Sequence, residues 1–242
     1  MPRSLRLPYR LLLALCLGVT TVTGSAQVSP ADTMAALKGH PACDTARYWR
    51  APAFLFPGVC FLYGGLKPLS TGIRQLDDSL YTRMLTREAG FHVNAEDYLM
   101  WTPSAAIYAL DALHVKTRHT FAQHLLLDAG SILVTGGAGL VMRRISRQIP
   151  AYSAYPTKFP SGHTANAFRS AELFHQELRF THPVLSYGGY VVAGTVGVLR
   201  LYNKDHLLSE VLTGAGLGIL STKFTYWLFG KITCRKGRAR VP

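Results

Sequence analysis

The segment KFPSGHTANAF, residues 158–168, has the residue order of a chain turn followed by the start of an α-helix. Pro160 ends the preceding loop, Ser161 is a favourable N-cap, and Gly162 allows another group to approach the backbone closely. The free N–H groups of such a helix start attract anions, and His163 lies beside them. A capping serine next to a surface histidine without a function would give the same residue pattern. This segment alone therefore does not decide between an anion site and a simple helix start.

A second segment, VLRLYNKDHLLSEVLTGAG at 198–216, carries another histidine close to an expected helix start. We expect Asn203 to cap this helix, which places His206 in the first turn and Glu210 four residues later on the same face. A carboxylate at this spacing fixes the tautomer of an imidazole and stabilises its positive charge when the ring attacks or accepts a proton. Arg200 supplies a cation suited to phosphate oxygens. The alternative is a solvated helix start with an ordinary His–Glu pair.

The two segments are spaced so that they can meet. Between His163 and Arg200 the chain has room for one helix outward, a turn near 182–183 and one helix back. Both histidines therefore return to the same end of a helical bundle. Two helix N-termini, two histidines and an arginine at one end predict a phosphate site.

The rest of the sequence predicts an all-α protein. Helix-length apolar segments lie at about 51–66, 98–112, 121–143, 163–179, 184–201 and 206–229. Strand alternation is absent, and Gly and Pro fill the gaps between segments, so a helical bundle is expected. With 242 residues, 48% of them apolar, one folded domain is the default.

The N-terminal residues predict export. MPRSLRLPYR is basic and is followed by the apolar run LLLALCLGVTTVTG, which is the order of a secretory signal. A buried N-terminal helix is the alternative. The expected organisation is a signal peptide at 1–26, a polar segment at 27–50, a helical domain at 51–230 and a basic tail at 231–242.

The charge and the cysteine content limit which partners and ligands are expected. The 26 Lys and Arg residues outnumber 13 Asp and Glu residues, which favours an anionic partner such as a phosphorylated metabolite or an acidic lipid, while export argues against nucleic acid. Cys43, Cys60 and Cys234 have no metal-ligand spacing, so no metal site is expected, and a single disulfide stays open. The oligomeric state cannot be predicted.

Signals for a membrane location conflict. The uncharged runs are shorter than the roughly 20 residues of a span, and Arg169, Glu172 and Glu177 would be costly in lipid. Gly214 and Gly218, four residues apart, allow the close helix approach that is common in membranes. The basic C-terminal end would suit a cytoplasmic anchor. We expect membrane association, with the number of spans open.

At these residues the chain resembles the type 2 phosphatidic acid phosphatase and vanadium haloperoxidase superfamily, over about 51–228. Its pattern is Lys, six residues, Arg-Pro; then Pro-Ser-Gly-His; then Ser-Arg, five residues, His, three residues, Asp. Here 160–163 matches the second motif in full. Arg200, His206 and Glu210 match the third in spacing, with Glu for Asp and Leu199 for Ser. The segments FPSGHTA and RxYNxxH resemble those of exported bacterial members.

The resemblance implies a six-helix bundle, with the active site at one end, that hydrolyses phosphate monoesters or pyrophosphates without a metal or other cofactor. By this resemblance His206 is the nucleophile that forms a phosphohistidine, Glu210 orients it, and His163 protonates the leaving oxygen. The residues expected to hold the phosphoryl oxygens are Ser161, Gly162 and Arg200.

The first motif departs from the family pattern. Counting back from Pro150, Met142 stands in place of Lys and Ile149 in place of Arg. Arg147 is the neighbouring cation assigned to the substrate, with Arg143 and Arg144 close by. On a regular helix Arg143 and Arg147 form a stripe about 100–140° from Met142, so compensation is expected to need a rotated or unwound helix end.

The resemblance implies three possible functions. The favoured one is a phosphatase at the periplasmic face of the cell envelope, acting on phosphatidate, a prenyl pyrophosphate or lipid A. The second is a catalytically impaired phospholipid-binding relative, which Met142 and Ile149 support. The third is a vanadate-dependent haloperoxidase, which requires a richer set of cations. Asp97 and Asp128 fall near expected helix ends and are interpreted as structural.

Overall fold

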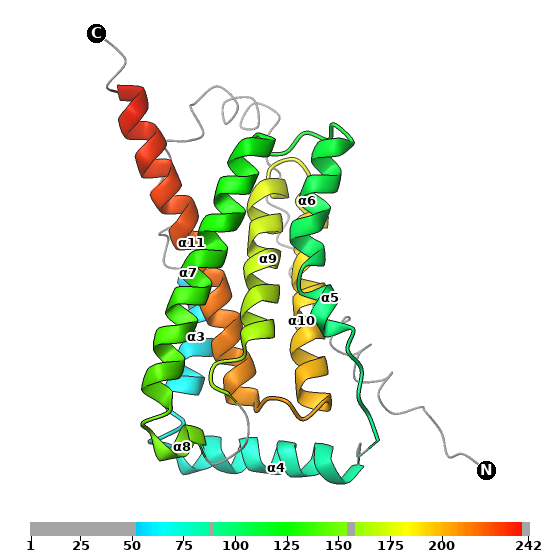
Figure 1. The fold of residues 1–242 in the computed structure, drawn as a ribbon, viewed down its shortest axis with the longest axis vertical. Coiled ribbons are helices and arrows are strands. Elements are labelled where there is room, and N and C mark those ends of the chain that lie inside the picture. Colours follow the sequence, from blue (N-terminus) through cyan, green and yellow to red (C-terminus); the bar gives the residue numbers. More distant parts are fainter. Residues whose placement is uncertain (1–51, 88–89, 154–157, 239–242) are drawn as a thin grey trace, which may run out of the picture. The chain divides into compact units, whose positions relative to one another are not determined.

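The computed structural model describes residues 52–87, 90–153 and 158–238 (Figure 1). The expected signal peptide and the polar segment at 27–50 lie outside these residues. Within the described ranges the chain forms no strand, and the expected all-α class is confirmed. The helices are α3 (Pro52–Gly65), α4 (Thr71–Arg87), α5 (Glu96–Leu99), α6 (Thr102–Ala112), α7 (Phe121–Ser146), α8 (Pro150–Ser153), α9 (Gly162–Leu178), α10 (Gly188–Tyr202) and α11 (Leu208–Arg238), with a 3₁₀ turn η3 (Leu185–Tyr187).

Each of the six expected apolar segments corresponds to a helix, but the described chain contains nine α-helices instead of six. The additional ones are α4, α5 and α8. The α4 sequence TGIRQLDDSLYTRMLTR is mostly polar, which is why apolar periodicity does not find it. At the other end of the domain, α11 continues to Arg238, so the segment expected as a basic tail begins inside a helix.

The start of α9, the end of α10 and the start of α11 lie at the same end of the bundle, where α4 crosses it (Figure 1). Buried Asp77 of α4 accepts a hydrogen bond from the backbone N–H of Ser209, at 3.1 Å, in the first turn of α11. The α4 helix is thereby fixed across the end of the bundle that contains both histidine motifs.

Helix α9 is the core of the domain and packs against α6, α7, α10 and α11. Its charged residues point inward: Arg169 and Glu172 are both fully buried. Arg169 Nη1 donates to Ser131 Oγ at 2.9 Å and pairs with Asp128, and Lys223 Nζ donates to Glu172 Oε1 at 2.7 Å. These charges, which would be costly in lipid, are therefore paired inside the protein.

Helices α9 and α11 approach each other closely through two glycines. A Cβ atom at Gly218 would lie 2.1 Å from the carbonyl oxygen of Ala165, and one at Gly214 would lie 2.6 Å from that of Ser161. Neither distance is possible for a real Cβ atom, so only glycine fits at these positions. The close helix approach expected from this pair is confirmed.

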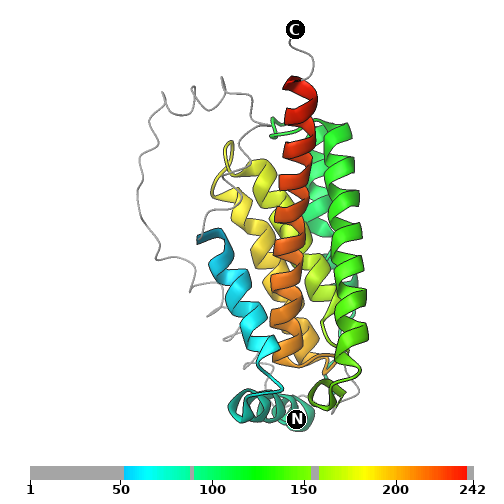
Figure 2. The same ribbon diagram turned by 90° about the vertical axis from the view of Figure 1, so that its left-hand side faces the viewer.

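The outer surface of the bundle is apolar along two helices, α3 and α7, which lie on either side of α11 (Figure 2). Among the described helices, α7 alone is long and apolar enough to cross a membrane by length and composition. Its outward side chains include Leu126, Leu133 and Leu140, with exposed fractions of 65%, 75% and 68%. On α3, Leu55 and Leu62 are 70% and 62% exposed.

Candidate active site

Ser161 starts α9 as expected. Its backbone is extended, its side chain is fully buried, and Oγ accepts from the N–H of Thr164 at 3.4 Å, which is N-cap geometry. Gly162 and His163 are then the first two residues of the helix, and His163 is half-buried. The imidazole therefore lies beside a helix N-terminus.

His206 lies in the turn between α10 and α11, two residues before Leu208, and not in the first helical turn. Glu210 is fully buried, and its Oε2 lies 2.7 Å from His206 Nδ1 and accepts from the N–H of Leu207 at 3.2 Å. One carboxylate therefore holds both the imidazole and the backbone at the start of α11.

The expectation that Asn203 caps α11 is wrong. Asn203 is the C-cap of α10, and its Nδ2 donates to the carbonyl oxygen of Val93 at 2.8 Å. The physical reason is the next residue, Lys204, which takes a left-handed conformation with φ 63° and separates the two helices. The side chain of Asn203 therefore binds the segment before α5, at Val93, and does not cap α11.

The two histidines face one cavity of about 780 Å³. Its polar lining includes Thr135, Arg143, Lys158, Gly162, His163, Asn166, Arg200, Asp205 and His206. Ser161 and Glu210 are fully buried and are not part of the lining. The structure thus brings Gly162, His163, Arg200 and His206 together.

Arg143 provides the α7 cation of the cavity. The α7 residues that line it are Ile132, Thr135, Gly136, Gly139, Leu140 and Arg143, which follow helical spacing on one face. Met142 is off this face, and α7 is helical to Ser146. Arg143 therefore reaches the cavity without the expected rotated or unwound helix end. That expectation assumed that the helix face at Met142 is turned toward the site, whereas the face that lines the cavity carries Arg143.

The structure separates Arg147 from this group. It is the exposed C-cap of α7 and does not line the cavity. Lys158, directly before the Phe-Pro-Ser-Gly-His run, does line it and was not assigned a role from sequence. The helical spacing of Gly136, Gly139 and Leu140 is the sequence signal that places Arg143 on the same face of α7.

Several donors of the cavity have no hydrogen-bond partner among the described residues. They are Nε of Arg143, Nε of Arg200 and Nδ2 of Asn166, all buried. The cavity is also lined by three cationic residues, Arg143, Lys158 and Arg200. Phosphoryl oxygens are strong acceptors for such cations, so the cavity suits a phosphate group.

Carboxylates of α5 also contact the site. Glu96 Oε1 accepts from Arg200 Nη1 at 3.1 Å, and Asp97 Oδ1 lies 2.8 Å from His163 Nε2. Burial lowers the pKa of His163, and the positive charge of Arg200 lowers it further. The hydrogen bond to Asp97 raises that pKa without reversing the net direction. Asp97, interpreted from sequence as structural, therefore contacts the predicted general acid.

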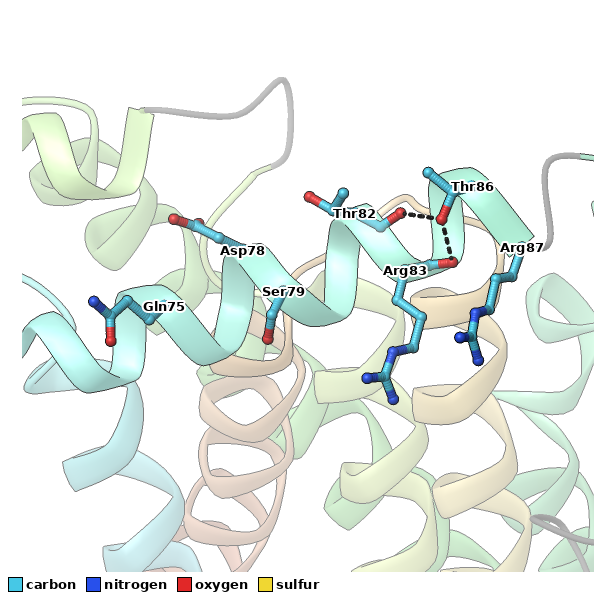
Figure 3. Close-up of a pocket in the computed structure, with 7 residues that line it drawn as sticks. All are labelled: Gln75, Asp78, Ser79, Thr82, Arg83, Thr86 and Arg87. Carbon is cyan, nitrogen blue, oxygen red and sulfur yellow. Dashed lines mark hydrogen bonds between the residues drawn. The ribbon is translucent and has the colours of Figure 1, made fainter.

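A second hollow of about 600 Å³ lies on α4 (Figure 3) and is formed by that helix alone. Its lining residues are Gln75, Asp78, Ser79, Thr82, Arg83, Thr86 and Arg87. It is open to solvent and includes none of the predicted site residues, so the cavity between α7, α9 and α10 is the candidate active site. Among the described residues, no group of three or more His, Cys, Asp or Glu side chains is placed to hold a metal ion.

One histidine at the start of α9 and one in the turn before α11 line a cationic cavity, which is an arrangement suited to binding phosphate. Residues 138–234, which contain both histidines, match the PAP2 superfamily, and this part of the chain belongs to that superfamily.

The chain is also 30% identical over 190 residues to the lipid A 1-phosphatase of Porphyromonas gingivalis, a match that covers 73% of this chain and 42% of the relative. The chain thus spans less than half the length of the curated relative that it matches. No solved structure gives a significant match.

Proposed function

We propose that this protein is a metal-independent phosphatase that removes phosphate from an envelope lipid through a phosphohistidine on His206. The observation that carries the proposal is the His206–Glu210 pair, 2.7 Å apart, at a cavity that His163, Arg143 and Arg200 also line. The named activity of the relative, a lipid A phosphatase, supports the same class of reaction.

In the first step His206 Nε2 attacks phosphorus, because Nδ1 is bonded to Glu210. The P–O bond to the lipid breaks as the P–N bond forms, and His163 gives its proton to the leaving alkoxide. In the second step water attacks the phosphohistidine, His163 takes a proton from that water, and the P–N bond breaks to free inorganic phosphate. Arg143 and Arg200 would stabilise the charge on the phosphoryl oxygens in both steps.

The shape of the cavity supports a lipid as substrate. Besides the cations, its lining includes the apolar side chains of Met100, Trp101, Leu140 and Leu217, together with Gly136, where a Cβ would meet nothing within 4 Å. Leu140 also belongs to the exposed apolar face of α7. A volume of about 780 Å³ has room for a phosphate headgroup and the beginning of a chain, so the rest of a lipid would extend along this face.

The same surface supports attachment to the membrane. Exposed leucines cover the outside of α3 and α7, while Arg169 and Glu172 are buried and paired within the bundle. Contact with lipid would remove these apolar side chains from water, and it would not place the buried charges of α9 in the lipid. Together with the expected signal at 1–26, this arrangement supports a location at the periplasmic face of the cell envelope.

Release of inorganic phosphate from radiolabelled phosphatidate, prenyl pyrophosphate and lipid A tests the proposal. We expect release from at least one of the three by the purified protein without added metal, and loss of that release in His206→Ala. Binding of a lipid without release would instead favour the phospholipid-binding alternative. Vanadate-dependent oxidation of bromide by peroxide would favour the haloperoxidase.

A further inference from the structure

The short helix α5 carries two adjacent carboxylates, and each contacts a different group of the active site. Glu96 is only 2% exposed and accepts from both Arg200 Nη1 and Asn203 Nδ2, the latter at 2.5 Å. Asp97 Oδ1 lies 2.8 Å from His163 Nε2. Both carboxylates lie outside residues 138–234, so the PAP2 match assigns them no role.

Asp97 is held in place by more than its contact with His163. Asn203 bonds both the N–H and the carbonyl oxygen of Val93, at 3.1 and 2.8 Å, and Lys204 Nζ donates to the carbonyl oxygen of Phe91 at 3.0 Å. These bonds fix the chain before α5 on the turn that carries His206. The Asp97 side chain is 52% exposed, and an isolated pair at such a surface contributes little, but here the backbone presents the carboxylate to the ring.

The two active-site histidines use different ring nitrogens for their carboxylates. His206 contacts Glu210 through Nδ1, which leaves Nε2 for the attack on phosphorus. His163 contacts Asp97 through Nε2, which leaves Nδ1 as the nitrogen available to the leaving oxygen. Because an ionised carboxylate only accepts, the nitrogen that it contacts carries the proton in both rings.

Charged groups surround His163 on several elements. Arg143 of α7, Lys158 before α9, Arg200 of α10 and His206 of the turn line the same cavity, as does the carboxylate of Asp205. A general acid must carry its proton before it can donate it, and this cationic environment opposes protonation of His163. Asp97 is the carboxylate bonded directly to the ring.

We propose that Asp97 is a positioning residue that orients His163 and keeps it protonated, so that the site works with two carboxylate–histidine pairs. This inference rests on the proposed phosphatase function. His206–Glu210 supplies the nucleophile, and His163–Asp97 supplies the proton to the leaving oxygen. Glu96 anchors α5 on Arg200 and Asn203 and thereby places Asp97.

The test compares two phosphate esters with different leaving groups. The alkoxide that leaves phosphatidate needs a proton, whereas p-nitrophenolate leaves without one. General acid catalysis contributes about 10²–10⁴-fold, so Asp97→Asn should lower kcat/KM on phosphatidate by roughly ten- to a hundredfold and kcat/KM on p-nitrophenyl phosphate by less than about twofold. The comparison uses kcat/KM because it reports only the steps up to departure of the leaving group, whereas hydrolysis of the phosphohistidine is common to both esters. Asp97→Glu should restore most of the loss. Asp78→Asn, on α4, removes one negative charge outside the cavity and should leave both rates near those of the parent.

The pH profile gives a second readout. Asp97 raises the pKa of His163, so its removal should move the basic limb of kcat/KM for phosphatidate to lower pH. Equal losses on both esters, or an unmoved basic limb, would overturn the positioning role while the phosphatase function stood. A parent protein that hydrolyses neither ester would overturn the proposed function and, with it, this role.

Discussion

The backbone N–H of Ser161 donates to the carbonyl oxygen of Glu210 at 3.1 Å, and this bond joins the N-terminus of α9 to the first turn of α11. Ser161 caps the helix that carries His163, and Glu210 holds the ring of His206. The two histidine motifs are thus coupled through the backbone as well as through the cavity. The relative position of acid and nucleophile therefore depends on how closely α9 and α11 pack.

His206→Ala is expected to abolish phosphate release and any acid-labile phosphoenzyme, because the nucleophile is absent. Glu210→Gln should weaken both without abolishing them, since the amide can still contact the ring but cannot stabilise its positive charge. Rapid quench with ³²P-labelled substrate measures both quantities. His182→Ala removes an exposed imidazole beyond the end of α9 and serves as the control. Turnover at the parent rate in His206→Ala would show that the reaction follows another route.

Arg143→Ala should lower kcat/KM far more than Arg147→Ala. Losing one well-placed donor typically costs about 2.7–4 kcal/mol, or roughly a hundred- to thousandfold in rate. Arg143 lines the cavity, whereas Arg147 is exposed outside it. The loss of Arg147 should therefore change the rate by no more than about twofold.

Steady-state phosphate release from the best lipid substrate measures the contrast between the two arginines. Ile149→Arg should add little, because Arg143 and Lys158 already supply cations to the cavity. If Arg147→Ala lowered the rate more than Arg143→Ala, the phosphate-binding cation of α7 would be Arg147, which would contradict the assignment of Arg143.

Local signals in the sequence were sufficient for the helix start at Ser161 and for the pairing of His206 with Glu210. An N-cap and an i, i+4 pair depend on residues close in the chain, so their spacing can be interpreted without the fold. The all-α class follows in the same way from apolar periodicity.

The remaining features depend on tertiary contacts. Asn203 is a reasonable N-cap by residue type, but the left-handed Lys204 and the distant Val93 decide its role. The polar α4 is fixed across the bundle through Asp77, which bonds Ser209 far along the chain. Asp97 reaches His163 because a separate segment folds back over the turn, and no local pattern predicts that contact.

Gly218→Val should destabilise the domain. Its Cβ would lie 2.1 Å from the carbonyl oxygen of Ala165, so α9 and α11 would have to separate. Overpacking of this kind typically costs about 1–3 kcal/mol, and the thermal unfolding midpoint in detergent should fall accordingly. Gly194→Val on α10 makes the same change where a Cβ would meet nothing within 4 Å, and it should leave the midpoint near that of the parent. Equal effects of the two changes would mean that α9 and α11 are not in close contact.

Gly136→Leu should separate lipid substrates from small ones. Gly136 lines the cavity, and a Cβ there would meet no atom within 4 Å, so the backbone has space for a side chain, and a leucine would occupy space expected to hold the lipid chain. The cationic end would be unchanged, and hydrolysis of p-nitrophenyl phosphate should stay within about twofold of the parent, as for a surface change remote from the reacting groups. KM for phosphatidate should rise at least about tenfold, because roughly two lost CH₂ contacts at 0.8 kcal/mol each account for such a change. Gly137→Leu is the matched control, since Gly137 is the next residue of α7, is equally open and does not line the cavity. If Gly136→Leu and Gly137→Leu had the same effect on phosphatidate, the chain would not bind along α7, and the lipid would enter the site by another path.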